Sequence, residues 1–350
     1  MKVSLGNKSF SMDENSVLII AEAGVNHDGD ISKALKLIDV AYDAGADAIK
    51  FQAFKTEKLI KKGVQKAKYQ INQGTSDESQ FEMLKSLELN SNDFKTLKDY
   101  SESKGLLFLT TPFDVESLET LIDIDLSAYK VASTDTTNLP FLIQIAEKTN
   151  VPILLSTGMC YFEEVEKAVS ILNKYNKKIV LMQCTSNYPT DDSEINLNVL
   201  NAYKNFENCL LGFSDHSIGH EASLMAFAMG ARVIEKHFTI NSSDPGPDHA
   251  ASLEPRELKS FVKRIRRAEK MLGSKKKEPT FSEIDNRKKL QKSLVAKKSI
   301  KKGEPFTLEN IVAMRIGVDG MSPVNYEKLL ANRASKDYLE GEILLIEEIM

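Results

Sequence analysis

Two histidines occupy positions from which they could bind one metal ion. His216 and His237 each lie in an apolar run, and each follows a polar residue by two positions, Ser214 and Glu235 respectively. Residues two apart on a β-strand point the same way, so each pair is expected to share a face of its strand. Imidazole and carboxylate ligands suit Mn²⁺, Fe²⁺ or Zn²⁺. The spacing favours a metal site at the two histidines; the alternative is that each is only hydrogen-bonded in place.

Two lysines lie inside apolar runs, where a role at the surface explains them poorly. Lys50 stands in AIKFQAF and Lys130 stands in AYKVAS. Either lysine could act as a Schiff-base nucleophile, or both could clamp a phosphate or carboxylate. Other runs end in the hydroxyl donors Ser156, Ser186 and Ser214, which suit phosphate binding better than imine chemistry.

The elements that must position these residues alternate between two kinds along the first 273 residues. The strand-like runs are 17–24, 48–54, 106–113, 128–133, 152–157, 179–186, 210–216 and 233–239. Amphipathic, helix-like segments lie between them, for example 31–44, 92–104, 115–123, 162–175, 221–229 and 255–272. This alternation predicts parallel strands with crossover helices, and eight such strands predict a (β/α)8 barrel. An open doubly wound sheet is the alternative, although no GxGxxG motif follows the first run.

A barrel would gather the polar ends of these strands at one mouth, which is where barrel active sites lie. The strand-like runs end in, or lead into, polar residues such as Glu22, Gln52, Thr111 and Tyr188. The loop 241–255 after the eighth run brings Asp248 near the same mouth, although a plain structural turn explains this loop equally well.

The chain is predicted to form two domains. Residues 1–273 form the barrel, and the charged segment 274–292, with few apolar residues, forms a linker. Residues 293–350 form a small second domain with β-like runs at 293–296 and 342–346.

The composition argues against several classes of protein. The 350 residues carry a net charge of -4, which gives no support for nucleic-acid binding. No apolar stretch approaches a membrane span, and no signal peptide is recognisable. The three cysteines, Cys160, Cys184 and Cys209, form no motif, which favours the reducing cytoplasm.

Several segments together resemble one known family over nearly the whole chain. The sequences AEAGVNHDG, IKFQAF, TPFD, STGM, CTSNYP, FSDHSIGHEAS, VIEKHFT and GPDHAASLEP resemble the signature segments of the bacterial sialic acid synthases. That family includes the N-acetylneuraminate, legionaminate and pseudaminate synthases. The tail SLVAKKSIKKGEPFTLENI resembles their C-terminal antifreeze-like (SAF) domain.

The resemblance implies a fold, an assembly and a reaction. The fold is a (β/α)8 barrel followed by a small antifreeze-like domain of the β-clip type, in a domain-swapped homodimer. The reaction joins phosphoenolpyruvate to an open-chain N-acetylmannosamine-type sugar, giving a nine-carbon sialic acid and phosphate. A divalent cation assists it, with Mn²⁺ as the expected ion and Mg²⁺ or Co²⁺ as alternatives; it polarises the sugar aldehyde as a Lewis acid.

The matching motifs also imply roles for individual residues. His216 and His237 match the metal ligands, and Glu22 matches the carboxylate that faces the sugar. The positions that match phosphoenolpyruvate contacts are Lys50, Thr111, Lys130, Ser156, Ser186 and Ser214. The positions on the sugar side are Gln52, Asp135, Tyr188, Asp248 and Arg315, the last supplied by the partner subunit. Either Glu22 or Glu235 could manage the proton transfers.

Two departures from the family pattern, and one similarity within it, bear on the sugar side of the site. Asp135 stands where the family often has a glutamate, so its side chain is one methylene shorter. Ile316 replaces the proline that usually follows Arg315, which loosens the loop that presents this arginine. The segment 68–80 is more similar to legionaminate-type and general bacterial synthases than to neuraminate synthases of capsule pathways.

Two other functions are alternatives to the synthase. The first is a barrel aldolase in which Lys50 or Lys130 forms an imine. The second is a carbohydrate- or ice-binding protein without catalysis, a hypothesis that leaves the polar barrel mouth without a purpose.

Overall fold

The computed structural model describes residues 2–67 and 79–348. The chain divides into two compact units, Met1–Gly273 and Ser274–Met350, and each is described by itself. None of the described helices is both long and apolar enough to cross a bilayer.

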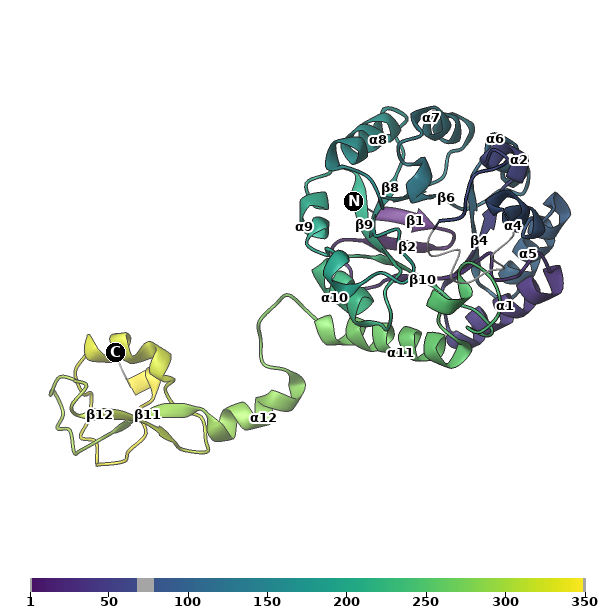
Figure 1. Ribbon diagram of the computed structural model, residues 1–350. Coiled ribbons are helices and arrows are strands. Elements are labelled where there is room, and N and C mark those ends of the chain that lie inside the picture. Colours follow the sequence, from purple (N-terminus) through teal and green to yellow (C-terminus); the bar gives the residue numbers. More distant parts are fainter. Residues whose placement is uncertain (1, 68–78, 349–350) are drawn as a thin grey trace. The chain divides into compact units, whose positions relative to one another are not determined.

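The first unit is built around one sheet of eight parallel strands (Figure 1). The strands are β3 (Leu18–Gly24), β4 (Ala48–Ala53), β5 (Leu107–Pro112), β6 (Tyr129–Val131), β7 (Ile153–Ser156), β8 (Ile179–Cys184), β9 (Cys209–Asp215) and β10 (Val233–His237). Their order is β5-β4-β3-β10-β9-β8-β7-β6, and the two end strands, β5 and β6, contact each other. The predicted (β/α)8 barrel is therefore confirmed, and each predicted strand corresponds to an observed one.

Helices surround this sheet. They are α1 (Ile31–Ala44), α2 (Thr56–Leu59), α4 (Gln80–Ser86), α5 (Ser91–Ser103), α6 (Val115–Asp123), α7 (Leu139–Lys148), α8 (Phe162–Lys174), α9 (Val199–Tyr203), α10 (Glu221–Met229) and α11 (Pro255–Leu272). Short 3-10 helices are η1 (Ser133–Asp135), η2 (Asp192–Glu194) and η3 (His249–Ala251). Local signals fix their ends: at α1 the Asp30 side chain accepts the Ser32 backbone N–H, and Gly45 closes the helix at φ 80°.

An N-terminal hairpin that the sequence analysis did not predict packs against one end of the barrel. Its strands are β1 (Lys2–Leu5) and β2 (Lys8–Ser11). Val3, Leu5 and Phe10 form a buried cluster with inward-facing residues from the first halves of the barrel strands, such as Leu18 and Leu154. Because apolar side chains fill this end, polar chemistry is confined to the opposite end, where the strands finish.

The second unit is small and has its own core. It contains α12 (Phe281–Leu290), β11 (Lys292–Ala296), β12 (Ile311–Arg315), α13 (Tyr326–Leu330), η4 (Pro323–Asn325) and η5 (Ile346–Glu348). Strands β11 and β12 pair antiparallel, and side chains such as Ile300, Phe306 and Tyr338 form the core.

The segment 274–292, which was predicted to be a linker, contains helix α12, whose residues are all exposed. Thr280 and Glu283 form a capping box that starts this helix. The helix has no buried face, so a hydrophobic periodicity could not predict it. The run 342–346 is not a strand; only Ile343 forms an isolated bridge, to Val295.

Candidate active site

The carboxyl ends of the barrel strands surround a cavity of about 420 Å³. Thirteen of the fifteen predicted site residues line it: Glu22, Lys50, Gln52, Thr111, Lys130, Ser156, Ser186, Tyr188, Ser214, His216, Glu235, His237 and Asp248. The predicted alternation holds, since Lys50 with Gln52, Ser214 with His216, and Glu235 with His237 all reach this one cavity.

The two histidines lie next to each other in the cavity. Their ring centroids are 5.4 Å apart, and the rings are inclined at 63°. His216 Nδ1 lies 2.7 Å from the Thr185 carbonyl oxygen. A carbonyl only accepts hydrogen bonds, so Nδ1 carries the proton and Nε2 keeps its lone pair for a ligand.

The second histidine offers an unused nitrogen beside a carboxylate. His237 Nδ1 is buried without a hydrogen-bond partner, and it lies 3.8 Å from Asp248 Oδ2. His216 Nε2 lies 3.4 Å from the Ser214 hydroxyl oxygen. Two adjacent imidazoles and a nearby carboxylate are the donor set that first-row divalent cations take. The residues present therefore fit a divalent cation at His216 and His237.

Tyr188 packs directly on both histidines. Its ring centroid is 4.1 Å from that of His216, nearly stacked, and 5.5 Å from that of His237, edge-on. Such aromatic contacts restrict the rotation of both imidazoles. Tyr188 therefore holds the geometry of the candidate metal site as well as lining the cavity.

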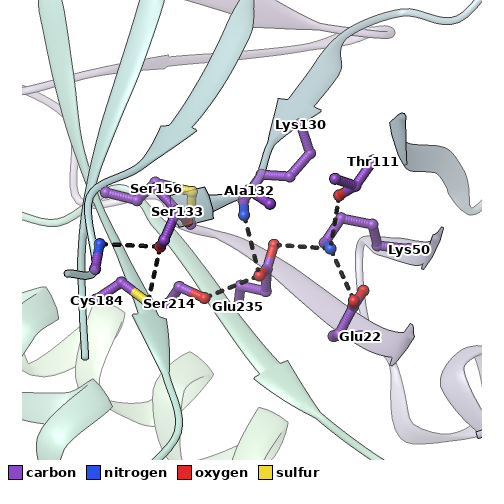
Figure 2. A network of polar contacts seen from close by, with 12 residues as sticks. Glu22, Lys50, Thr111, Lys130, Ala132, Ser133, Ser156, Cys184, Ser214 and Glu235 are labelled. Carbon is purple, nitrogen blue, oxygen red and sulfur yellow. Dashed lines mark hydrogen bonds and ion pairs between the residues drawn. The ribbon is translucent and has the colours of Figure 1, made fainter. Parts of the chain in front are cut away.

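A buried network of charged side chains lines the same cavity (Figure 2). Lys50 Nζ lies 2.8 Å from Glu22 Oε1 and donates to Thr111 Oγ1 at 3.2 Å. Glu235 lies between the two lysines, with Oε2 3.7 Å from Lys50 Nζ and Oε1 3.5 Å from Lys130 Nζ. All four charged side chains are buried, so their charges act on one another and on any ligand with little screening by water.

Burial and neighbouring charges separate the protonation behaviour of the two glutamates. Burial raises the pKa of Glu22, and the opposing effect of Lys50 does not cancel this shift. Burial would also raise the pKa of Glu235, but Lys130, Lys50 and the Ser214 hydroxyl outweigh it and lower that pKa to about 2. Glu235 is thus a fixed anion, while Glu22 can exchange a proton. For Lys50, burial favours the neutral form, but Glu22 and Glu235 together raise its pKa.

Hydroxyl groups and a glycine form the next part of the wall. Ser133 Oγ accepts the Gly158 backbone N–H at 2.9 Å, and Ser156 Oγ is buried without a hydrogen-bond partner. A Cβ on Gly158 would lie 2.3 Å from Ser186 Oγ and 2.9 Å from Ser133 Oγ. The missing side chain keeps these hydroxyls close to one another, which suits an anion with several oxygens.

Three polar side chains converge next to Gly24. Gln52 Nε2 donates to Glu22 Oε1 at 3.2 Å. A Cβ on Gly24 would lie 3.3 Å from both Asp248 Oδ2 and Gln52 Nε2 and 3.4 Å from Glu22 Oε1. This cluster can bind the hydroxyl groups of a sugar.

The loop that carries Asp248 is held by buried contacts. His249 follows Asp248. Its Nδ1 lies 2.6 Å from Thr239 Oγ1, and its Nε2 lies 3.0 Å from Asp28 Oδ1. The Ser252 hydroxyl donates to the Asp248 carbonyl at 2.6 Å. Asp248 therefore lines the cavity from a fixed position, so the loop is more than a surface turn.

Two predicted residues do not line the cavity. The Asp135 carboxylate points to its own turn, where it accepts from Asn138 Nδ2 at 3.0 Å and from Thr134 Oγ1 at 3.3 Å. Its neighbours Ser133 and Thr134 line the cavity in its place. Arg315 belongs to the second unit, where it ends β12 with an exposed side chain. Of the segment 68–80, only residues 79 and 80 are among the described residues.

Some lining residues escaped the sequence analysis. Cys184 lies at the end of β8, where position alone could have suggested it. An apolar part of the wall, which includes Phe54, Met83 and Phe113, carried no polar signal that would separate it from core.

Comparison with known proteins places this site in a family. The model of the NeuB family matches residues 37–277, and the SAF domain model matches residues 291–350. N,N'-diacetyllegionaminic acid synthase from Campylobacter jejuni is 44% identical over 93% of this chain and 98% of that protein. The protein of the same name from Legionella pneumophila is 39% identical over 95% and 94%.

Solved structures agree with this placement. The crystal structure of N-acetylneuraminic acid (sialic acid) synthetase from Leptospira borgpetersenii is 37% identical, covers 83% of this chain and 97% of that chain, and gives a TM-score of 0.71. The chain therefore belongs to the NeuB family, the sialic acid synthases that its motifs resemble, and carries a SAF domain after its barrel.

Proposed function

We propose that the chain is a nonulosonic acid synthase that condenses phosphoenolpyruvate with the aldehyde of an N-acetylmannosamine-type sugar. The products are a nine-carbon sialic-type acid and phosphate, which makes the enzyme a phosphoenolpyruvate-dependent transferase. One observation carries the proposal: two adjacent histidines lie in the same cavity as two buried lysines and a group of hydroxyls.

The lysine and hydroxyl side of the cavity suits phosphoenolpyruvate. This donor carries a carboxylate and a phosphate on three carbons, and Lys50 and Lys130 offer two ammonium groups to neutralise it. The hydroxyl groups of Ser156, Ser186 and Ser133 can donate to phosphate oxygens from one wall.

His216 and His237 would hold a divalent cation, with Mn²⁺ as our proposal and Asp248 beside it. Such a cation supplies Lewis-acid polarisation of the sugar aldehyde. The chain's own contribution is to fix the two imidazoles through Thr185 and Tyr188, so that the acceptor carbon faces the donor.

The reaction requires one new bond, one water and one departing group. The terminal alkene carbon of phosphoenolpyruvate bonds to the aldehyde carbon, and the aldehyde oxygen becomes a hydroxyl by gaining a proton. Water adds to the middle carbon, and the bond from that carbon to the phosphate oxygen breaks to leave a ketone. The two protons of the water end on the new hydroxyl and on the departing phosphate. We assign the proton transfers to Glu22, because one of its oxygens is free of hydrogen-bond partners and its pKa is raised by burial.

The structure gives reasons to prefer this reaction over imine chemistry. A Schiff-base lysine must lose its proton, yet Lys50 is paired with Glu22 at 2.8 Å and its pKa is raised. Burial does lower the pKa of Lys130. Trapping with borohydride tests this alternative directly, because an aldolase intermediate would leave a covalent adduct on Lys130.

We also propose an assembly and a cellular compartment for the enzyme. Each chain works in a domain-swapped homodimer, in which Arg315 reaches the sugar in the partner's site. The cytoplasm is the proposed location, which accords with free Cys160, Cys184 and Cys209. Mixing inactive His216→Ala chains with inactive Arg315→Ala chains tests the assembly, since mixed dimers would regain part of the activity.

Phosphate release is the assay for the reaction itself. The chain with Mn²⁺, phosphoenolpyruvate and an N-acetylated amino sugar should release phosphate and form a 2-keto acid in equal amounts. EDTA should stop both. Phosphate release without a sugar, or a product without any metal requirement, would contradict the proposal.

A further inference from the structure

A buried asparagine, Asn26, ties the ends of two barrel strands to the loop that carries Asp248. It follows β3, where its backbone N–H donates to the Ala23 carbonyl at 2.9 Å. Its side-chain nitrogen Nδ2 donates to the Phe238 carbonyl at 2.8 Å and to the Ser252 hydroxyl at 2.9 Å. Asn26 is fully buried and is not among the described residues that line the cavity. It can therefore act on the cavity only through the segments that it connects.

The first of these side-chain bonds reaches the end of the strand that carries His237. Phe238 directly follows His237, and its N–H donates to the Glu22 carbonyl at 3.0 Å. The His237 carbonyl accepts the N–H of Leu253 at 3.0 Å. With the bond from Asn26, both backbone polar groups of Phe238 and the carbonyl of His237 are bonded. The backbone immediately beyond His237 is therefore held in place by β3 and by the loop.

The second side-chain bond reaches the loop that brings a carboxylate beside His237. The Ser252 hydroxyl, which accepts from Asn26, donates to the Asp248 carbonyl at 2.6 Å. Asp248 Oδ2 lies 3.8 Å from His237 Nδ1. The amide, the hydroxyl and the carbonyl form one directional chain of hydrogen bonds, in which each bond polarises the next. One side chain thus holds both members of the pair His237 and Asp248.

The orientation of the Asn26 amide is fixed by its partner, and it leaves the amide oxygen unpaired. The Phe238 carbonyl only accepts hydrogen bonds, so the nitrogen of Asn26 must face it and Oδ1 must point away. Oδ1 is buried and has no hydrogen-bond partner among the described residues. A buried acceptor without a donor lowers stability. Asn26 is therefore poorly suited to packing alone, and its role lies in the two bonds that it donates.

We propose that Asn26 is a positioning residue for the divalent cation, and that it sets the spacing between His237 and Asp248 so that both face one ion. This inference rests on the proposed function, because it takes the cation to lie at the histidines. It goes beyond that function by giving a role to a residue outside the cavity lining. Its effect is on the affinity for the ion, which is measured without donor or sugar.

Mn²⁺ titration of the full-length chain, followed by electron paramagnetic resonance, measures this affinity without turnover. Asn26→Leu has a similar shape but donates no hydrogen bond, and it should raise the Kd for Mn²⁺ by about 10-fold or more. Ser252→Ala removes only the branch to Asp248 and should raise the Kd by a smaller factor, at least about 3-fold. This milder variant carries the test if Asn26→Leu does not fold. The wild-type Kd in folded Asn26→Leu, or in Ser252→Ala, would overturn the inference.

A double substitution separates positioning from a general loss of stability. Because Asn26 acts partly through Asp248, Asn26→Leu should raise the Kd by a clearly smaller factor in an Asp248→Ala background than in the wild type. Two effects that simply multiply would overturn the inference.

A control variant lowers stability at a site away from the cation. Thr149→Val removes a buried hydroxyl that donates to the Ile145 carbonyl at 2.7 Å, and Thr149 is not among the described residues that line the cavity. It should lower the urea midpoint of unfolding and leave the Kd for Mn²⁺ at the wild-type value. An equal rise of the Kd in Thr149→Val and Asn26→Leu would assign the effect to stability and overturn the positioning role.

The outcomes distinguish this inference from the proposed function. Phosphate release by the wild type, together with an unchanged Kd for Mn²⁺ in the variants, would overturn the role of Asn26 and leave the proposed function standing. A wild-type chain that binds no Mn²⁺ would overturn the proposed metal site and this inference with it.

Discussion

Asp215 and Lys236 form a buried ion pair of 3.0 Å on the outer side of the barrel, directly behind the two histidines of the cavity. They are partners in the register of β9 and β10, and each is followed at once by His216 or His237. Asp215 also accepts from the backbone N–H of Ser217 at 2.9 Å, and Lys236 donates to the Ser217 carbonyl. The pair therefore fixes how the chain leaves both strands at the point where the two proposed metal ligands, His216 and His237, follow.

Breaking this pair should weaken both the fold and the metal site. Asp215→Asn or Lys236→Met leaves one buried charge unpaired, and each should lower the free energy of unfolding by about 3–5 kcal/mol. The double variant removes both charges and should recover part of that loss, while Mn²⁺ affinity stays reduced. Urea unfolding and Mn²⁺ titration measure the two effects. Full Mn²⁺ affinity in a folded double variant would refute the positioning role.

Gly158 keeps space for the hydroxyls around the proposed phosphate. Gly158→Ala would place a methyl group 2.3 Å from Ser186 Oγ, so this hydroxyl must move. We expect KM for phosphoenolpyruvate to rise by about 10-fold or more, with little change in KM for the sugar. Ser133→Ala removes a hydroxyl without filling the space and should have a smaller effect. The reverse ranking would show that crowding at residue 158 is not what matters.

Glu22 and Lys50 contact each other, but substitutions of the two should affect different quantities: kcat for Glu22 and the Kd for phosphoenolpyruvate for Lys50. Glu22→Gln keeps the shape but not the proton exchange, and it should lower kcat by about 100-fold while leaving the Kd for phosphoenolpyruvate nearly unchanged. Lys50→Met removes an ammonium group and should raise that Kd by about 10-fold or more. Calorimetric titration with the donor, beside steady-state kinetics, separates these effects. A large change in the Kd of Glu22→Gln would place this residue in donor binding instead.

His27 should make the barrel sensitive to acid. Its side chain is fully buried, with Nδ1 accepting the Gly29 N–H at 3.0 Å, and burial lowers its pKa to about 4. The unfolded chain binds the proton near pH 6.5, whereas the folded barrel does not until about pH 4. Stability is therefore complete above pH 6.5 and falls as the pH drops toward 4, by roughly 3 kcal/mol from this residue.

The variant His27→Asn tests this dependence. Asparagine does not titrate and can still accept the Gly29 N–H, so the part of the pH slope that comes from residue 27 should disappear. Hydrogen exchange of barrel peptides at pH 7 and pH 4.5 reports the barrel apart from the second unit. The same pH slope in the wild type and the variant would exclude this origin.

The barrel and most of its site were predictable because two rules apply to the same residues: the alternation of side chains along a strand, and the position of active sites at the carboxyl ends of barrel strands. Strand alternation placed Glu235 and His237 on one face, and the barrel rule placed that face at the mouth. The hairpin β1–β2 was missed because four-residue strands carry too little pattern to separate them from a tail. Helix α12 was not predicted because it has no buried apolar face, and amphipathic periodicity was the signal used to recognise helices.

The limits of the site prediction have a physical cause as well. Asp135 lies in the 3-10 turn η1, which directs its carboxylate to Asn138. No residue pattern in the sequence predicts that turn. The apolar part of the cavity lining was not predicted, because Met83 and Phe113 cannot be distinguished from core residues in the sequence.

Mn²⁺ binding measured by electron paramagnetic resonance, with and without phosphoenolpyruvate, tests the central claim most directly. We expect one ion per wild-type chain, and an affinity at least about 100-fold lower in both His216→Ala and His237→Ala. His220→Ala, which alters a histidine outside the cavity lining, should bind as the wild type does. Undiminished binding in folded His216→Ala and His237→Ala would contradict the assignment of the metal site.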